Sequence, residues 1–129
     1  MESIIGNSRK PDITFYANGR IDITARLARQ LNLHNGDCID VGEANSNHYV
    51  YVRHRFNPDT NFSFEATVRS TKPRSRNFRA YSVKLCRRML QLCQAEKVAA
   101  PQVGKPYEHK VFDIIIPLIT RINLAEQNG

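Results

Sequence analysis

Eight lysine and arginine side chains between positions 69 and 88 are the residues of this chain with the clearest chemical use. No Asp or Glu lies among them, and the formal net charge of the whole 129-residue chain is only +7. They are Arg69, Lys72, Arg74, Arg76, Arg79, Lys84, Arg87 and Arg88. A local excess of positive charge attracts polyanions such as nucleic acid. The alternative is a charged loop followed by the solvated face of a helix.

Two aromatic residues interleave with these charges. Phe78 and Tyr81 stand between the basic residues of the loop and those of the helix that we expect after it. Aromatic rings among phosphate-binding cations can stack on bases, as in single-strand binders. Packing into the core is the commoner fate of such rings.

Other reactive residue types do not form a recognisable site. The histidines His34, His48, His54 and His109 are scattered, and the three cysteines have no C-x-x-C spacing. Zinc sites need closely spaced ligand pairs, which the sequence lacks. There is no nucleophile elbow, phosphate-binding loop or dinucleotide fingerprint. We therefore expect no enzyme, no metal, no cofactor and no small-molecule substrate.

The sequence also bounds the compartment. The first residues do not combine a charged head with an apolar run, so we expect no signal peptide. The most apolar stretch, 111–119, is nine residues long, whereas a membrane span needs about 20. An odd number of cysteines fits free thiols in a reducing environment. We predict a cytoplasmic protein without a membrane partner.

The first half of the chain predicts a compact unit. Apolar residues alternate with polar ones over 13–15 and 21–23, which is the period of half-buried strands. Asn18-Gly19 between them supplies the positive φ angles of a tight hairpin turn. Thr24 is a suitable N-cap for a following helix, and Asn35-Gly36 ends that helix or turns the chain. Two further paired strands are expected at 38–41 and 49–53, joined by a polar loop over 42–48.

The second half predicts a small sheet with one basic helix. Its expected elements are a strand through 62–68, a solvated loop at 71–77, a Ser82-capped helix to about Lys97, a loop at 99–106, a strand at 107–116 and a helical turn from Leu118 to Leu124. On the helix, Leu85, Met89 and Leu92 form an apolar stripe flanked by Cys86 and Cys93, which we interpret as structural thiols. A weak internal similarity at an offset of 91 residues, between 22–33 and 113–124, is best explained by chance.

Residues 12–55 resemble the AbrB-type swapped-hairpin DNA-binding domain of transition-state regulators and antitoxins. The shared residues are Gly19, Arg20, Ile21, Ile23, Leu27, Leu31, Leu33, Gly36, Asp37, Ile39 and Val41. The resemblance implies two chains with interlaced hairpins and a basic face on DNA. It places Arg20 at the family's turn arginine and Arg29 at one of two basic helix positions. Ala28 stands at the other, and Thr24 replaces the usual proline.

Together these observations predict an α+β fold with a swapped-hairpin-like β-β-α-β element followed by a small sheet and an amphipathic basic helix. The expected divisions are a flexible lead at 1–11, the AbrB-like element at 12–56, a C-terminal α+β part at 62–124 and a tail at 125–129. The predicted function is non-enzymatic binding of nucleic acid, duplex DNA in preference, by a homodimeric transcriptional regulator. The predicted contacts are Arg20, Arg29, Arg74, Arg76, Arg79, Lys84, Arg87 and Arg88. The alternative is a protein–protein interaction module, antitoxin-like or an accessory subunit, whose basic stretch docks an acidic partner.

Overall fold

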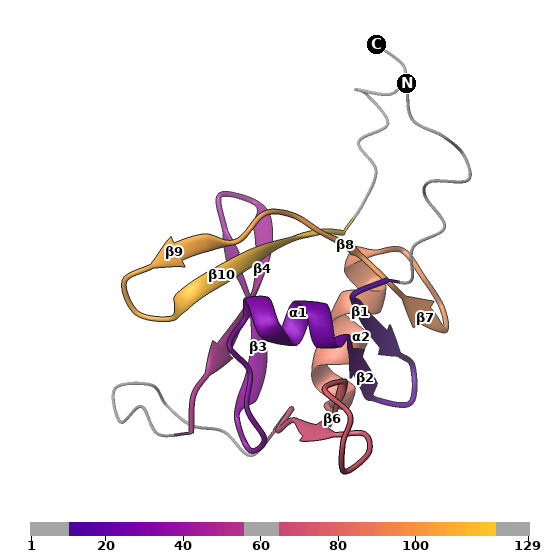
Figure 1. Ribbon diagram of the computed structural model, residues 1–129. Coiled ribbons are helices and arrows are strands. Elements are labelled where there is room, and N and C mark those ends of the chain that lie inside the picture. Colours follow the sequence, from indigo (N-terminus) through magenta and orange to yellow (C-terminus); the bar gives the residue numbers. More distant parts are fainter. Residues whose placement is uncertain (1–10, 56–64, 121–129) are drawn as a thin grey trace, which may run out of the picture.

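The computed structural model describes residues 11–55 and 65–120, which form an α+β arrangement of two sheets and two helices (Figure 1). The elements are β1 (Ile13–Tyr16), β2 (Arg20–Ile23), α1 (Ala25–Gln30), β3 (Cys38–Ala44), β4 (Asn47–Arg53), β5 (Arg69–Ser70), β6 (Phe78–Tyr81), α2 (Val83–Leu92), β7 (Val98–Ala99), β8 (Gln102–Val103), β9 (Tyr107–His109) and β10 (Asp113–Ile119). The predictions for residues 1–10, 56–64 and 121–129 lie outside the described residues.

Each sheet combines strands from both halves of the chain. The first has the order β5-β6-β2-β1-β7, and the second has β3-β4-β10-β8 with β9 paired to β10. All pairs are antiparallel, and β2 joins β6 while β4 joins β10. The first half follows the order hairpin, helix, hairpin, and the second half has the same order with the short strands β7 and β8 inserted after its helix. The offset of 91 does not describe this repetition, because it aligns α1 with residues of the strand β10.

The predicted first hairpin and its helix are confirmed. Ile13 and Phe15 pair with Ile23 and Ile21, and the Gly19 amide donates to the Tyr16 carbonyl at 2.9 Å. Gly19 has a φ of +97°, as the tight turn requires. Thr24 caps α1 by accepting a hydrogen bond from the Leu27 amide.

Both helices end through the same backbone device, which corrects the predicted length of α2. In α2 the Gln94 amide donates to the Gln91 carbonyl and the Ala95 amide to the Leu90 carbonyl, while Gln94 takes a φ of 54°. This Schellman arrangement satisfies the last carbonyls and turns the chain away. The helix therefore ends at Leu92 and not near Lys97. In α1, Asn32 occupies the equivalent left-handed position, so Asn35-Gly36 turns the chain after the helix has ended.

Several predicted loops and strands were wrong. The polar stretch 42–48 is mostly strand, because β3 and β4 extend to a two-residue turn at Asn45-Ser46, where both φ angles are positive. The predicted strand at 107–116 is the hairpin β9–β10. The predicted loop at 99–106 contains part of β7 and all of β8, and Leu118 lies in β10 and not in a helical turn. Pairing brought polar or proline-containing residues into ladders: β3–β4 and β9–β10 pair with their neighbours in the chain, whereas β7 pairs with β1 and β8 with β10.

The predicted strand at 62–68 is also corrected where it is described. Residues 65–68 contribute only an isolated bridge between Thr67 and Cys38, and Ala66 has a φ of 59°. The left-handed residue breaks the extended backbone there. The short strand β5 begins at Arg69 instead, followed by the exposed loop predicted at 71–77.

One hydrophobic core joins the two halves. Its fully buried side chains include Phe15, Leu27 and Val52 from the first half and Val68, Met89 and Ile116 from the second. The apolar side of α2 packs on β1, β2 and β7. The polar side of α2 is thereby directed to solvent.

Candidate nucleic-acid interface

The exposed side of α2 carries a line of polar side chains. Ser82 caps the helix by accepting from the Leu85 amide at 3.0 Å, and Cys86, Met89 and Leu90 are buried. Lys84, Arg87, Arg88 and Gln91 follow the spacing i, i+3, i+4, i+7, which places them on one helical face. These four residues, with Glu65 and Val83, line an open surface hollow of about 600 Å³. We call Lys84, Arg87, Arg88 and Gln91 the α2 stripe.

A second hollow extends the α2 stripe toward the other sheet. It has a volume of about 280 Å³ and shares Glu65, Lys84 and Arg88 with the first. Its far side is formed by β3 and β4, where Arg53 lies 3.4 Å from Asp40. The hollows together give a continuous surface on which Lys84 and Arg88 are central.

The eight predicted contact residues differ in whether an acid neutralises them. Arg79 Nε lies 2.8 Å from Asp22 Oδ1, and Arg20 Nε lies 3.4 Å from Asp22 Oδ2. The hydrogen bond to Asp22 raises the pKa of the Arg79 guanidinium above its ordinary value. Within 11–55 and 65–120, no carboxylate forms an ion pair with the other six: Arg29, Arg74, Arg76, Lys84, Arg87 and Arg88.

Arg20 is further held by its own sheet. Its guanidinium carbon lies 4.1 Å from the centre of the Tyr16 ring, a cation–π geometry. The Nε atom is buried and has no hydrogen-bond partner, although it lies 3.4 Å from Asp22 Oδ2. Arg20 is therefore positioned mainly by the Tyr16 ring. It is less free to reach a ligand than the cations of α2.

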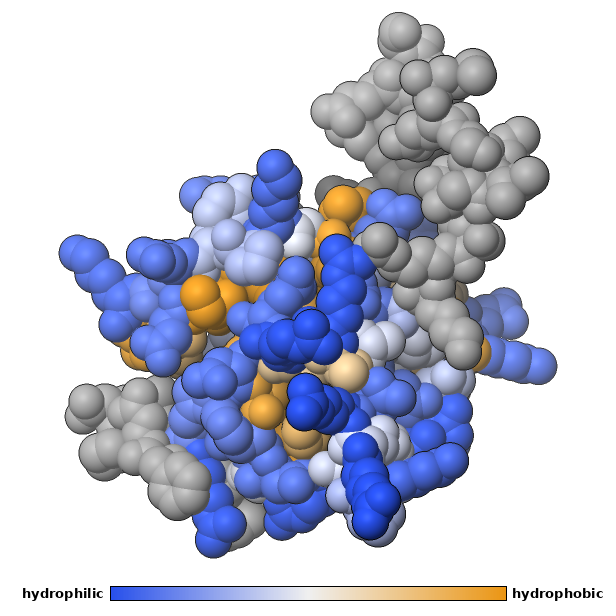
Figure 2. Space-filling view, in the orientation of Figure 1, coloured by the Kyte–Doolittle hydropathy of each residue, from blue (hydrophilic) through white to orange (hydrophobic). Residues whose placement is uncertain are grey.

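The remaining predicted cations lie near α1. Arg29 is in the last turn of α1, and Arg74 and Arg76 are exposed in the loop before β6. This loop is tied to α1, because Asn77 Oδ1 accepts from the Ala25 amide at 2.8 Å. Figure 2 shows strongly hydrophilic side chains gathered over α1 and over this loop. The structure thus divides the predicted site into three groups, at α2, at Asp22 and near α1.

Only one of the two interleaved aromatic residues faces solvent. Phe78 belongs to the hydrophobic core and is 9% exposed, so the idea that it stacks on bases was wrong. Tyr81 is 61% exposed and lies opposite Arg20 in the β2–β6 ladder. Side chains along a strand point alternately to opposite faces of the sheet, so Phe78 and Tyr81, three residues apart in β6, lie on different faces.

The cysteines have the character predicted for structural thiols. Cys86 is fully buried and its thiol lies 3.4 Å from the Arg20 carbonyl. Burial raises the pKa of both Cys86 and Cys93. A raised pKa disfavours the nucleophilic thiolate.

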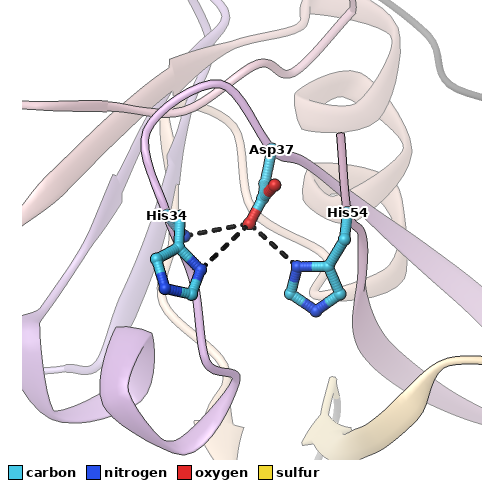
Figure 3. Close-up of side chains that lie close together, drawn as sticks. All are labelled: His34, Asp37 and His54. Carbon is cyan, nitrogen blue, oxygen red and sulfur yellow. Dashed lines mark hydrogen bonds and ion pairs between the residues drawn. The ribbon is translucent and has the colours of Figure 1, made fainter. Parts of the chain in front are cut away.

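The sequence interpretation missed a cluster of His34, Asp37 and His54 (Figure 3). Asp37 is 1% exposed, and its Oδ2 atom lies 2.9 Å from His54 Nδ1 and 3.8 Å from His34 Nδ1. The signal was present in the strand pairing, because Cys38 lies opposite Arg53 and the next pair outward is Asp37 and His54. Spacing along the chain could not reveal it, since residues 37 and 54 are brought together by a long hairpin.

Comparison with known proteins adds no relative. No protein family, curated protein or solved structure matches this chain. Neither helix in the described part has the length and apolar character that a bilayer crossing requires.

Proposed function

We propose that this protein is a non-enzymatic nucleic-acid-binding protein that prefers duplex DNA and contacts it through the α2 stripe. The observation that carries the proposal is that Lys84, Arg87 and Arg88 line one surface hollow and form no ion pair in the described chain. Three unpaired cations on one rigid face can each neutralise a phosphate and release its counterions.

The proposal of a duplex groove follows from the diameter of an α-helix, about 10–12 Å, which fits the major groove, while the α2 stripe supplies contacts along two turns. Lys84 and Gln91 are seven residues apart, a rise of about 10 Å along the helix axis. The major groove of B-DNA is about 12 Å wide and admits one helix. Arg87 and Arg88 would contact the backbone or guanine edges, while the Gln91 amide suits the donor and acceptor pair of adenine. We accordingly propose α2 as the reading element, with Arg29, Arg74 and Arg76 as phosphate contacts near α1.

A role in transcription regulation and a relation to AbrB-type domains are part of this proposal. The order β1-β2-α1-β3 supports the relation, because it matches the β-β-α-β element that the resemblance implies. The homodimer also remains a proposal. Since β2–β6 and β4–β10 pair within one chain, a second copy would add to these sheets without being needed to complete them. Multi-angle light scattering measures the number of chains directly.

Fluorescence anisotropy with a random 20-base-pair duplex, measured at several salt concentrations, tests the proposal. Log Kd should rise with log salt concentration, with a contribution of about 0.9 for each phosphate contact. The variant Lys84→Ala/Arg87→Ala/Arg88→Ala should lower this slope by about 2 to 3 units. A matched control, Lys97→Ala/Lys105→Ala/Lys110→Ala, removes three exposed charges elsewhere and should change it much less.

Two outcomes would contradict the proposal. Equal losses in both triple variants would show that net charge and not the α2 stripe attracts the DNA. Weak binding without salt dependence would favour the alternative, in which the same cations dock an acidic protein surface. The exposed Val83 within the hollow would add apolar contact to such an interface.

A further inference from the structure

We propose that His34, Asp37 and His54 form a binding site for a divalent transition-metal ion, with Zn²⁺ as the best fit. The two imidazoles approach the same oxygen of a buried carboxylate from different sides (Figure 3). The site is separate from the α2 stripe and does not depend on the proposed function.

The donor atoms are spaced as ligands of one ion. One ligand atom from each of His34, Asp37 and His54 lies within 4.8 Å of the other two. Tetrahedral zinc with bonds of about 2.0–2.1 Å separates its ligand atoms by roughly 3.3 Å. The 2.9 Å and 3.8 Å separations from Asp37 bracket that value. A small rotation of the His34 ring, whose side chain is 64% exposed, suffices to bring its nitrogen into range.

The backbone fixes the carboxylate before any ion arrives. Asp37 Oδ1 accepts from the Arg55 amide at 2.9 Å, and Oδ2 accepts from the His34 amide at 2.9 Å. Outer hydrogen bonds of this kind orient metal-binding carboxylates. These hydrogen bonds would be enough to bury Asp37 in a purely structural role. The feature that points to a metal ion is the pair of imidazole nitrogens directed at Oδ2. An ion would replace the hydrogen bond between His54 Nδ1 and Asp37 Oδ2.

The donor set selects the class of metal. Two imidazole nitrogens and one carboxylate oxygen suit Zn²⁺ and its transition-metal neighbours, whereas Ca²⁺ and Mg²⁺ prefer oxygen ligands throughout. Three protein ligands leave a fourth position for water. Exposure of His34 places that position on the solvent side, which gives the ion a route of entry.

Titration of the full-length protein with Zn²⁺ tests the site, with the ring nitrogens of all four histidines followed by NMR. His34 and His54 should shift together and saturate at one equivalent, while His48 and His109 stay unchanged. Thermal unfolding should move upward by about 5–10 °C when free Zn²⁺ is 100-fold above Kd.

Variants separate the site from accidental binding. His34→Ala should weaken Zn²⁺ binding at least tenfold, and because His34 is exposed this variant should still fold. His109→Ala, which removes another exposed imidazole, is the matched control and should bind as the parent does. If the Asp37→Asn variant folds, loss of the carboxylate should also weaken Zn²⁺ binding. Unchanged affinity in His34→Ala, shifts at His48 or His109, or no binding at micromolar Zn²⁺ would each overturn the proposal.

Discussion

A single carboxylate determines how much positive charge the outer face of the first sheet presents. Asp22 lies between Arg20 and Arg79 and interacts with both, although 57 residues separate it from Arg79 in the chain. The opposite charges of Asp22 and Arg79 also support the register in which these two residues are paired. The positive surface of the molecule is consequently stronger at α2 than at the first sheet.

Asp22→Asn should therefore strengthen nucleic-acid binding. The substitution frees the guanidinium group of Arg79, removes a carboxylate charge beside Arg20, and should raise affinity roughly fivefold at 0.1 M salt, with a steeper salt dependence. Because the ion pairs are partly exposed, the free energy of unfolding should fall by less than about 1 kcal/mol. Asp113→Asn makes the same change of charge on the exposed start of β10 and is the control for anisotropy measurements. Equal gains from both variants would show that only total charge matters.

The charged residues show which features of the candidate site the sequence could predict and which it could not. Counting charges between 69 and 88 identified a basic segment, and six of the eight residues predicted as contacts lack an ion pair within the described residues. The count could not reveal that Asp22 is brought beside Arg79, because strand pairing and not sequence proximity joins them. His34, Asp37 and His54 were missed for the same reason.

The turn of the first hairpin contacts the start of α2, and this contact couples two elements that are distant in sequence. The Ser82 amide donates to the Gly19 carbonyl at 2.8 Å, and Val83 begins α2 directly beside the turn. A Cβ atom on Gly19 would lie 2.9 Å from Val83 Cγ2 and 3.2 Å from the Val83 backbone nitrogen. Glycine is thus required there by space as well as by backbone conformation.

Gly19→Ala should destabilise the protein by about 2 kcal/mol or more, because left-handed backbone costs an alanine roughly 1–2 kcal/mol and the new methyl collides with Val83. Val83→Ala removes Cγ2 and should cost little alone, since Val83 is 51% exposed. In the double variant the collision with Cγ2 is relieved, so we expect a favourable coupling energy of about 1 kcal/mol in urea unfolding. Strictly additive effects would show that the contact between turn and helix does not carry the cost.

Local signals predicted the elements that they control and failed where distant strands intervened. Asn18-Gly19, Thr24 and Ser82 specify a turn and two helix caps through contacts within a few residues, and all three were predicted. The short strands β7 and β8 were not, because each exists only by pairing with β1 or β10. The Schellman end of α2 was also missed, since neither Gln94 nor its neighbours is a glycine.

The whole molecule depends on a core to which both halves contribute. Strand pairs β2–β6 and β4–β10 cross between the halves, and buried residues from each belong to one cluster. Neither half can bury its apolar face without the other. The positions of the α2 stripe and of the His34, Asp37 and His54 cluster therefore depend on one cooperative structure. A measurement of folding cooperativity tests this dependence.

Leu27→Ala in α1 and Met89→Ala in α2 should each lower stability by about 2–5 kcal/mol, because both side chains are fully buried. Pulsed thiol labelling with mass spectrometry reports each half separately, through buried Cys38 in β3 and buried Cys86 in α2. If the core is shared, either substitution should move the urea midpoints of Cys38 and Cys86 labelling together. Ile119→Ala, at an exposed position of β10, controls for the loss of apolar surface and should move neither midpoint appreciably. Exposure of Cys38 alone in Leu27→Ala, with Cys86 still protected, would show that the halves unfold independently.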